Sequence, residues 1–153
     1  MKAKQLLFTT FAMALSVNIW ASGLEQVSSS HSVDQTTENL VKELNKLKDK
    51  GVRVFTVIDH MANAKNVGLK LPPTKLVIFG NPNVGTKLMQ CAHTTAIDLP
   101  QKYLVYQNKA GKTVITYNNP SYLAERHQMK GCEAVIGKIQ GLLAGVANKA
   151  AAK

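Results

Sequence analysis

The sequence predicts a compact two-layer α+β domain, in which helices pack on a mixed, largely antiparallel sheet. Apolar residues at helical spacing alternate along the chain with short runs of β-branched residues. Two such runs, at 98–107 and 112–118, flank a polar segment at 108–111, a pattern typical of an antiparallel hairpin. With 153 residues the chain has room for one such domain, which we place at 22–150.

Residues 1–21 differ in character from the rest and predict a cleaved signal peptide. Lys2 and Lys4 precede an apolar run at 6–19, and Ala21 supplies a small residue at the cleavage point. Polar residues interrupt the run, which is too short to span a bilayer. We therefore expect a soluble protein that is exported to the periplasm and has no membrane span.

The first half of the domain predicts strand, helix, strand and helix in that order. Residues 23–29 form a short strand candidate. Ser32 is expected to begin a helix, because Gln35 three positions later completes a capping box. Residues 52–59 alternate and are rich in β-branched side chains, which predicts a strand. Residues 60–69 then predict a short helix that ends before two prolines.

The second half predicts two helices that begin in the same way. Residues 74–80 form an apolar strand, typical of the inside of a sheet. Asn81 and Pro82 supply an N-cap and a proline at the first helical position, and we expect this helix to run toward Thr95. After the hairpin, Asn119-Pro120 repeats the start, and a closing helix follows that frays through the last five residues.

Residues 80–87 nearly match a phosphate-binding loop of the Walker type. Thr86 and Lys87 stand in exchanged order relative to that motif. Adjacent helical positions point about 100° apart, so the exchange misdirects both side chains. Pro82 also removes one backbone N–H donor. We interpret the segment as a strand-to-helix connection and expect no nucleotide hydrolysis.

Charge and cysteine content narrow the class of protein further. The net charge is +10, but only Arg53 and Arg126 are arginines, and no aromatic residues interleave with the closely spaced Lys46, Lys48 and Lys50. This composition predicts a solvated lysine face, compatible with an acidic ligand, and no nucleic-acid partner. In an exported protein, Cys91 and Cys132 are expected to form a disulfide. The alternative is two thiols that serve redox or metal chemistry.

The two Asn-Pro steps favour binding of a small anionic ligand. Free N–H groups and the dipole of a helix start attract anions. We expect charge from Lys102 and Arg126 and hydroxyl groups from Thr86 and Tyr117. The prediction requires that both helix starts share one cleft with these cations.

An enzyme is the first alternative, since acid–base chemistry needs an oriented imidazole. His60 follows an aspartate at a strand end, and His127 follows an arginine on a helix. A soft-metal protein is the second alternative, with sets of Met, Cys and His near positions 89–93 and 127–132. Helical spacing points the first set in different directions, so we expect no metal and no cofactor.

Three motifs, at 79–89, 98–102 and 117–127, together resemble the domain of unknown function 302 family. The resemblance implies a compact α+β domain that pairs as a homodimer and has no established reaction. Asn119 and Asn83 depart from the pattern, which is expected to have Asp at the first position and often Lys at the second. Carried over residue by residue, the pattern points to His60, Asn81, Gly85, Thr86, Asp98, Lys102, Tyr117, Arg126 and His127.

Overall fold

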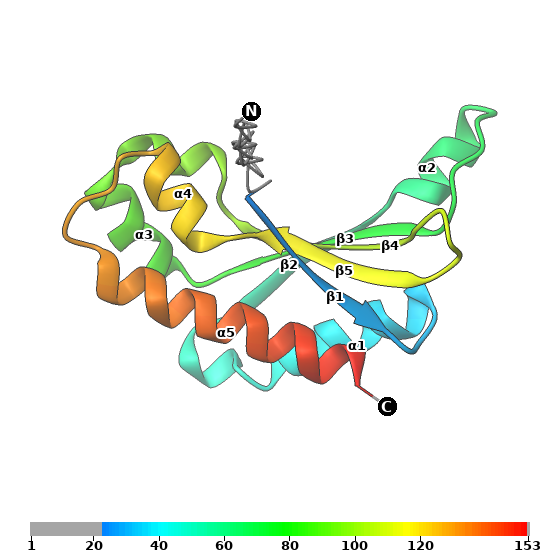
Figure 1. The fold of residues 1–153 in the computed structure, drawn as a ribbon, viewed down its shortest axis with the longest axis horizontal. Helices are drawn as coiled ribbons and strands as arrows, with labels where there is room; N and C mark the ends of the chain where they lie inside the picture. The colour runs from blue at the N-terminus through cyan, green and yellow to red at the C-terminus, as the bar shows by residue number, and fades with distance from the viewer. Residues whose placement is uncertain (1–22, 153) are drawn as a thin grey trace, which may run out of the picture.

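The computed structural model describes residues 23–152, so the predicted signal peptide at 1–21 lies outside the described residues. One sheet carries two long helices on one face, and shorter helices extend from its ends (Figure 1). The elements are β1 (Leu24–Ser29), α1 (Val33–Asn45), η1 (Lys48–Lys50), β2 (Arg53–Asp59), α2 (His60–Asn66), β3 (Thr74–Gly80), α3 (Pro82–Cys91), η2 (His93–Ile97), β4 (Gln101–Gln107), β5 (Thr113–Asn118), α4 (Pro120–Arg126) and α5 (Glu133–Ala151).

The sheet has the strand order β1-β5-β4-β3-β2, and every neighbouring pair is antiparallel. The α+β class is confirmed, but no parallel pair accompanies the antiparallel ones within residues 23–152. The reason is that each of the strands β2 to β5 pairs with the next one along the chain. Strand β1 lies on the free side of β5 and runs in the opposite direction to it.

The core lies between the sheet and the helices α1 and α5. Leu40 and Leu44 of α1 are fully buried against Val77 of β3 and Ile115 of β5. Tyr103 of β4 is the largest fully buried side chain among the described residues, and its hydroxyl donates a hydrogen bond of 2.7 Å to the Leu143 carbonyl of α5. Burial raises the pKa of the Tyr103 phenol far above its usual value, which keeps this donor protonated. The bond ties the closing helix to the central strands.

Helix α3 is shorter than the sequence predicts. It ends at Cys91, because Ala92 adopts an extended conformation, and the 3₁₀ helix η2 follows. The Thr95 hydroxyl donates to the Ala92 carbonyl and stabilises this break. The prediction of one helix toward Thr95 is therefore wrong, and the chain turns sharply before it enters β4.

The C-terminal ends of strands β3 and β5 lie at the same end of the sheet, because both strands run opposite to β4. The helices α3 and α4 therefore leave from this end, with the start of β4 between them. Cys91 at the end of α3 and Cys132 just before α5 form a disulfide with a Cα–Cα distance of 6.5 Å. The predicted cysteine pair is thus present, and it joins α3 to the start of α5.

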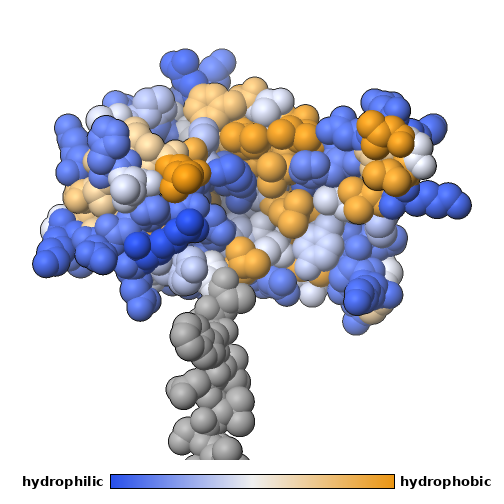
Figure 2. All heavy atoms as spheres, turned by 90° about the horizontal axis from the view of Figure 1, so that it is seen from above, coloured by the Kyte–Doolittle hydropathy of each residue, from blue (hydrophilic) through white to orange (hydrophobic). Residues whose placement is uncertain are grey.

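Apolar side chains also gather on the sheet face that points away from α1 and α5 (Figure 2). The strand register places Ile58, Leu76 and Leu104 in one cross-strand row on this face. Val67 and Leu69, in the connection after α2, are also exposed. In the part of the chain that the structure describes, no helix combines the length and apolarity needed to cross a membrane.

Helix α5 carries three glycines at four-residue intervals, Gly137, Gly141 and Gly145. A Cβ atom built at any of them would meet no atom within 4 Å apart from its chain neighbours and the adjacent backbone of α5 itself. These glycines therefore serve no close approach of another described segment.

Candidate functional site

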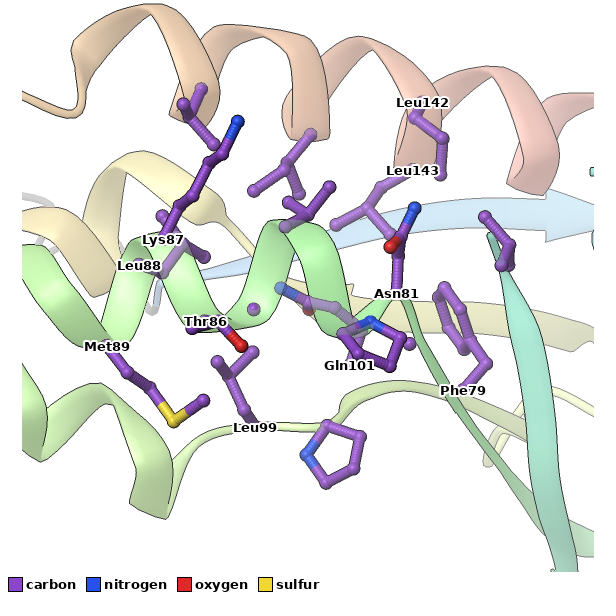
Figure 3. Close-up of a pocket in the computed structure, with 18 of the residues that line it drawn as sticks. Phe79, Asn81, Thr86, Lys87, Leu88, Met89, Leu99, Gln101, Leu142 and Leu143 are labelled. Carbon is purple, nitrogen blue, oxygen red and sulfur yellow. The ribbon is translucent and has the colours of Figure 1, made fainter. Parts of the chain in front are cut away.

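A pocket of about 600 Å³ opens between α3, α5 and the β2 edge of the sheet (Figure 3). Figure 3 shows Asn81 at the start of α3 and Lys87 on the side of α3 that faces α5, the helix that carries Leu142 and Leu143. Most lining side chains are apolar. They are Val52, Phe55, Phe79, Pro82, Val84, Leu88, Met89, Ala96, Leu99, Pro100, Val135, Ile139, Leu142 and Leu143.

Helical spacing and a β-bulge supply the apolar walls. Val84 and Leu88 lie one turn apart on α3 and so face the same side. Strand β2 shifts register between Val54 and Thr56, which leaves Phe55 as the extra residue of a bulge, with 52% of its surface exposed. The Phe55 ring lies so close to Gly80 that a Cβ there would be 3.2 Å from it. Glycine at this position therefore lets the ring cover the pocket's edge.

Five polar residues complete the lining: Asn81, Thr86, Lys87, Gln101 and Lys138. Neither lysine forms an ion pair within residues 23–152. Both are exposed, so they lie where the apolar pocket meets water. Of the residues predicted from sequence, Asn81, Gly85 and Thr86 belong to this pocket.

At the helix start after Asn81, the backbone N–H donors of the first turn bond to Asn81 itself. The Asn81 side chain accepts from the Asn83 N–H, and its carbonyl accepts from the N–H groups of Val84 and Gly85. The carboxamide also donates to the carbonyl of Lys50, at 2.8 Å. The N–H groups of the first turn are thus already bonded within the protein.

The helix start at Asn119 is capped in the same way and does not line the pocket. Its side chain accepts from the N–H groups of Ser121 and Tyr122, and its carbonyl accepts from Leu123. The Asn119 carboxamide donates to the Glu25 carboxylate at 2.6 Å. The two Asn-Pro starts therefore lie at the same end of the sheet, but only the first lines the pocket.

A second group of predicted residues meets around Asp98, which lies between η2 and β4. His127 Nε2 lies 2.5 Å from one carboxylate oxygen of Asp98, and an Arg126 guanidinium nitrogen lies 3.4 Å from the other. The Lys102 ammonium donates to the main-chain carbonyls of Asp98 and Pro100, at 2.8 Å each. Four residues predicted separately from the sequence thus form one polar cluster.

Thr94 belongs to the same cluster and was not predicted from the sequence. Its hydroxyl lies 3.0 Å from His127 Nδ1. The sequence gives only one indication of this contact, the spacing of four residues between Thr94 and Asp98. That spacing did not identify Thr94, because the helix that begins at Asn81 was expected to continue toward Thr95.

The remaining predicted residues lie elsewhere. Tyr117 is 6% exposed in the core, edge-on to Tyr103, and burial followed by the nearby Glu25 charge raises the pKa of its phenol. His60 begins α2 at the end of the sheet opposite to α3 and α4, because β2 runs antiparallel to β3. His60 and His127 therefore do not converge on one site.

A separate charged group surrounds the start of α2. The Asp59 side chain accepts from the Ala62 N–H, and Lys75 bridges Asp34 and Asp59. The bond from Ala62, supported by the Lys75 charge, lowers the pKa of Asp59. The hydrogen bond to Asp34 raises the pKa of Lys75. These groups cap a helix and tie it to α1.

Comparison with known proteins gives relatives of two kinds. The chain is 48% identical over 108 residues to the "Fluoride-specific ion channel FluC 1" of Brucella suis biovar 1 (strain 1330), covering 71% of this chain and 41% of that protein. A protein of that name from Brucella abortus biovar 1 (strain 9-941) gives the same identity and length, over 39% of its chain. The chain thus spans about two fifths of the curated relatives it matches.

The fold is similar to a crystal structure of an "uncharacterized conserved protein DUF302 from Bacillus stearothermophilus", with a TM-score of 0.73 and 22% identity over 85% of this chain and 99% of that one. The family model "Domain of unknown function DUF302" matches residues 25–146, most of the region that the structure describes. The chain therefore belongs to the DUF302 family.

Proposed function

We propose that the chain binds a small molecule with an apolar body and an anionic end in the pocket between α3 and α5. The observation that carries this proposal is a pocket of about 600 Å³ with mainly apolar walls and two lysines that form no ion pair with any residue the structure describes. Pockets of this size and character suit small organic ligands, which a few polar groups orient.

Lys87 and Lys138 are the cations best placed for the anionic end. They lie on α3 and α5, the two walls of the pocket. The sequence predicted this role for Lys102 and Arg126, and that arrangement stays a prediction. Their contacts do not support it, because the Arg126 guanidinium is paired with the Asp98 carboxylate and the Lys102 ammonium already donates to two main-chain carbonyls. The dipole of the ten-residue helix α3 adds a weaker attraction at its start.

Export to the periplasm and pairing as a homodimer remain part of the proposal. The charged and apolar pattern of residues 1–21 and the disulfide support export. The resemblance to the family supports pairing. Cell fractionation and light scattering of the purified protein test these two points separately from ligand binding.

Binding is tested with dodecanoate and dodecan-1-ol, which share a chain and differ in charge. We expect calorimetry to show heat of binding for dodecanoate and weaker binding for the alcohol. Neutralising Lys87 and Lys138 by Lys→Gln should weaken dodecanoate binding about fivefold, since exposed charge pairs contribute roughly 0.5 kcal/mol each. Lys109→Gln with Lys112→Gln, on the hairpin outside the pocket, is the control matched in charge.

The apolar wall is tested by Leu142→Glu, which places a carboxylate at the pocket on an exposed helix position. We expect at least a tenfold loss of dodecanoate binding, because the new charge must be desolvated beside a like charge. Asn148→Glu adds the same charge to the same helix outside the pocket and should leave binding unchanged. Equal binding by both variants would contradict the proposal.

A second candidate function is action beside a membrane ion channel. The identity of 48% to parts of proteins named as fluoride-specific ion channels favours it. In those relatives the matched part accounts for about two fifths of the chain, so this type of domain occurs within longer proteins that bear a channel name. Deletion of the gene should then increase fluoride sensitivity of growth, and growth that is unaffected by fluoride would count against this candidate.

A further inference from the structure

We propose that Thr94, His127 and Asp98 form a nucleophile–base–orienter relay that accepts acyl groups from small carboxylic esters. This inference is independent of the binding pocket, because none of the three residues lines it. It rests on the way in which η2 and the end of α4 bring the three side chains into one hydrogen-bonded row.

The row has the donor directions that nucleophilic catalysis needs. An ionised carboxylate only accepts hydrogen bonds, so the 2.5 Å contact with Asp98 places the imidazole proton on His127 Nε2. Nδ1 is then free to accept, and the Thr94 hydroxyl, 3.0 Å away, donates to it. A hydroxyl that donates to an imidazole oriented by a carboxylate is the arrangement of the serine triad, here with a threonine and with the roles of the two ring nitrogens exchanged.

Burial separates the roles of the three side chains. The side chains of His127 and Asp98 are only 6% and 14% exposed, whereas Thr94 is an exposed residue. Arg126 contacts the second carboxylate oxygen and holds Asp98 in place. The base is thus shielded and fixed in orientation, while the nucleophile remains open to a substrate.

A donor for the substrate carbonyl lies beside the hydroxyl. Thr94 is the second residue of η2, so its N–H has no acceptor within that helix, and none of the described turns, caps or side chains accepts from it. A backbone N–H of the nucleophile itself commonly helps to hold the developing oxyanion. With the row of side chains, this N–H gives the site one group for each required role.

The step balances within the protein and its substrate. Thr94 Oγ1 bonds to the ester carbonyl carbon, and its proton moves to His127 Nδ1. The C–O bond to the leaving alcohol breaks, and that alcohol takes the proton from His127. Water then attacks the acyl–Thr94 ester with His127 as base, which releases the carboxylic acid and restores the hydroxyl.

The experiment treats the full folded chain with a short-chain alkyl fluorophosphonate and maps the adduct by peptide mass spectrometry. We expect phosphonylation of Thr94, with release of fluoride, and no adduct on Thr86, a threonine that is also exposed but has no histidine partner. Hydrolysis of p-nitrophenyl butyrate should fall in parallel as the adduct forms.

Variants separate chemistry from folding. His127→Gln should slow phosphonylation at least about a hundredfold, as expected for loss of a general base. Thr94→Val should abolish the adduct and Thr94→Ser should retain it, and both changes lie at an exposed position that should leave thermal unfolding nearly unchanged. Adducts on lysine or tyrosine only, or equal rates in His127→Gln at equal stability, would overturn the proposal and leave the row as a structural clamp.

Discussion

The helices α3 and α4 begin alike and end differently. Each follows a strand at the same end of the sheet, starts at an Asn-Pro step and uses the asparagine side chain and carbonyl as caps. Helix α3 then ends in the disulfide to Cys132 and forms a wall of the pocket. Helix α4 ends in the contact between His127 and Asp98 and forms part of a polar cluster. The local motif thus determines how a helix begins, while distant partners decide what its far end is used for.

The largest effect is expected from the covalent end of α3. Replacing Cys91 and Cys132 by serine removes a link between positions separated by 41 residues, and loop-closure entropy then predicts a loss of about 4 kcal/mol in the free energy of unfolding. Urea denaturation measures this loss. A reductant should destabilise the native protein and leave the double variant unchanged, and a loss below 1 kcal/mol would show that the α3 end relies on packing alone.

The non-covalent end of α4 should contribute less. Asp98→Ala removes a largely shielded carboxylate that His127 and Arg126 share, and hydrogen bonds to charged groups contribute roughly 1.5–3 kcal/mol. We expect a loss of about 2 kcal/mol, measured by thermal unfolding. Glu125→Ala, an exposed change on α4 away from this contact, should have little effect and serves as the control.

The two asparagine caps offer a finer comparison. Asn81→Ala and Asn119→Ala should each cost about 1 kcal/mol, the usual contribution of a helix cap. The cost at Asn119 should be larger, because its carboxamide also donates to the Glu25 carboxylate, whereas Asn81 donates to a neutral carbonyl. In a Glu25→Gln background the difference between the two should shrink. An equal cost in both backgrounds would show that Glu25 contributes nothing.

The smallest effect involves a cap that titrates. Asp59 caps α2 with a carboxylate whose pKa is lowered below its ordinary value of 3.8 in the folded protein. Its stabilising effect is therefore complete above that value and is lost as the pH falls through the lower folded pKa. Thermal midpoints should drop less between pH 5 and 2 in Asp59→Asn than in the native protein. Parallel curves would exclude this contribution.

Much of the fold follows from local patterns. The cap at Ser32, the strand at residues 74–80 and both Asn-Pro helix starts were predicted, because each depends on a few adjacent residues. The break at Ala92 was missed, since the stretch around it has no proline or glycine. The absence of a parallel pair was also missed, because it depends on where β1 docks, and its partner β5 lies much later in the sequence.

The candidate sites were predicted as residues but not as groups. Asp98, Lys102, Arg126 and His127 were singled out, yet the sequence does not show that they bind one another instead of a ligand. The apolar pocket as such was not predicted, although Asn81, Gly85 and Thr86 of its lining were singled out as ligand-binding residues. Its walls come from α3, α5 and the β2 bulge, and ordinary core spacing in a sequence looks the same whether a space is filled or left open.

The three glycines of α5 bear on the design of stabler variants. Each lets the unfolded chain explore conformations that alanine forbids, and none is needed for close contact with a described neighbour. Replacement by alanine would raise helical propensity by about 1 kcal/mol per position. Alanine at these positions should therefore stabilise α5, the longest described helix, and the substitutions would change no residue that lines the pocket.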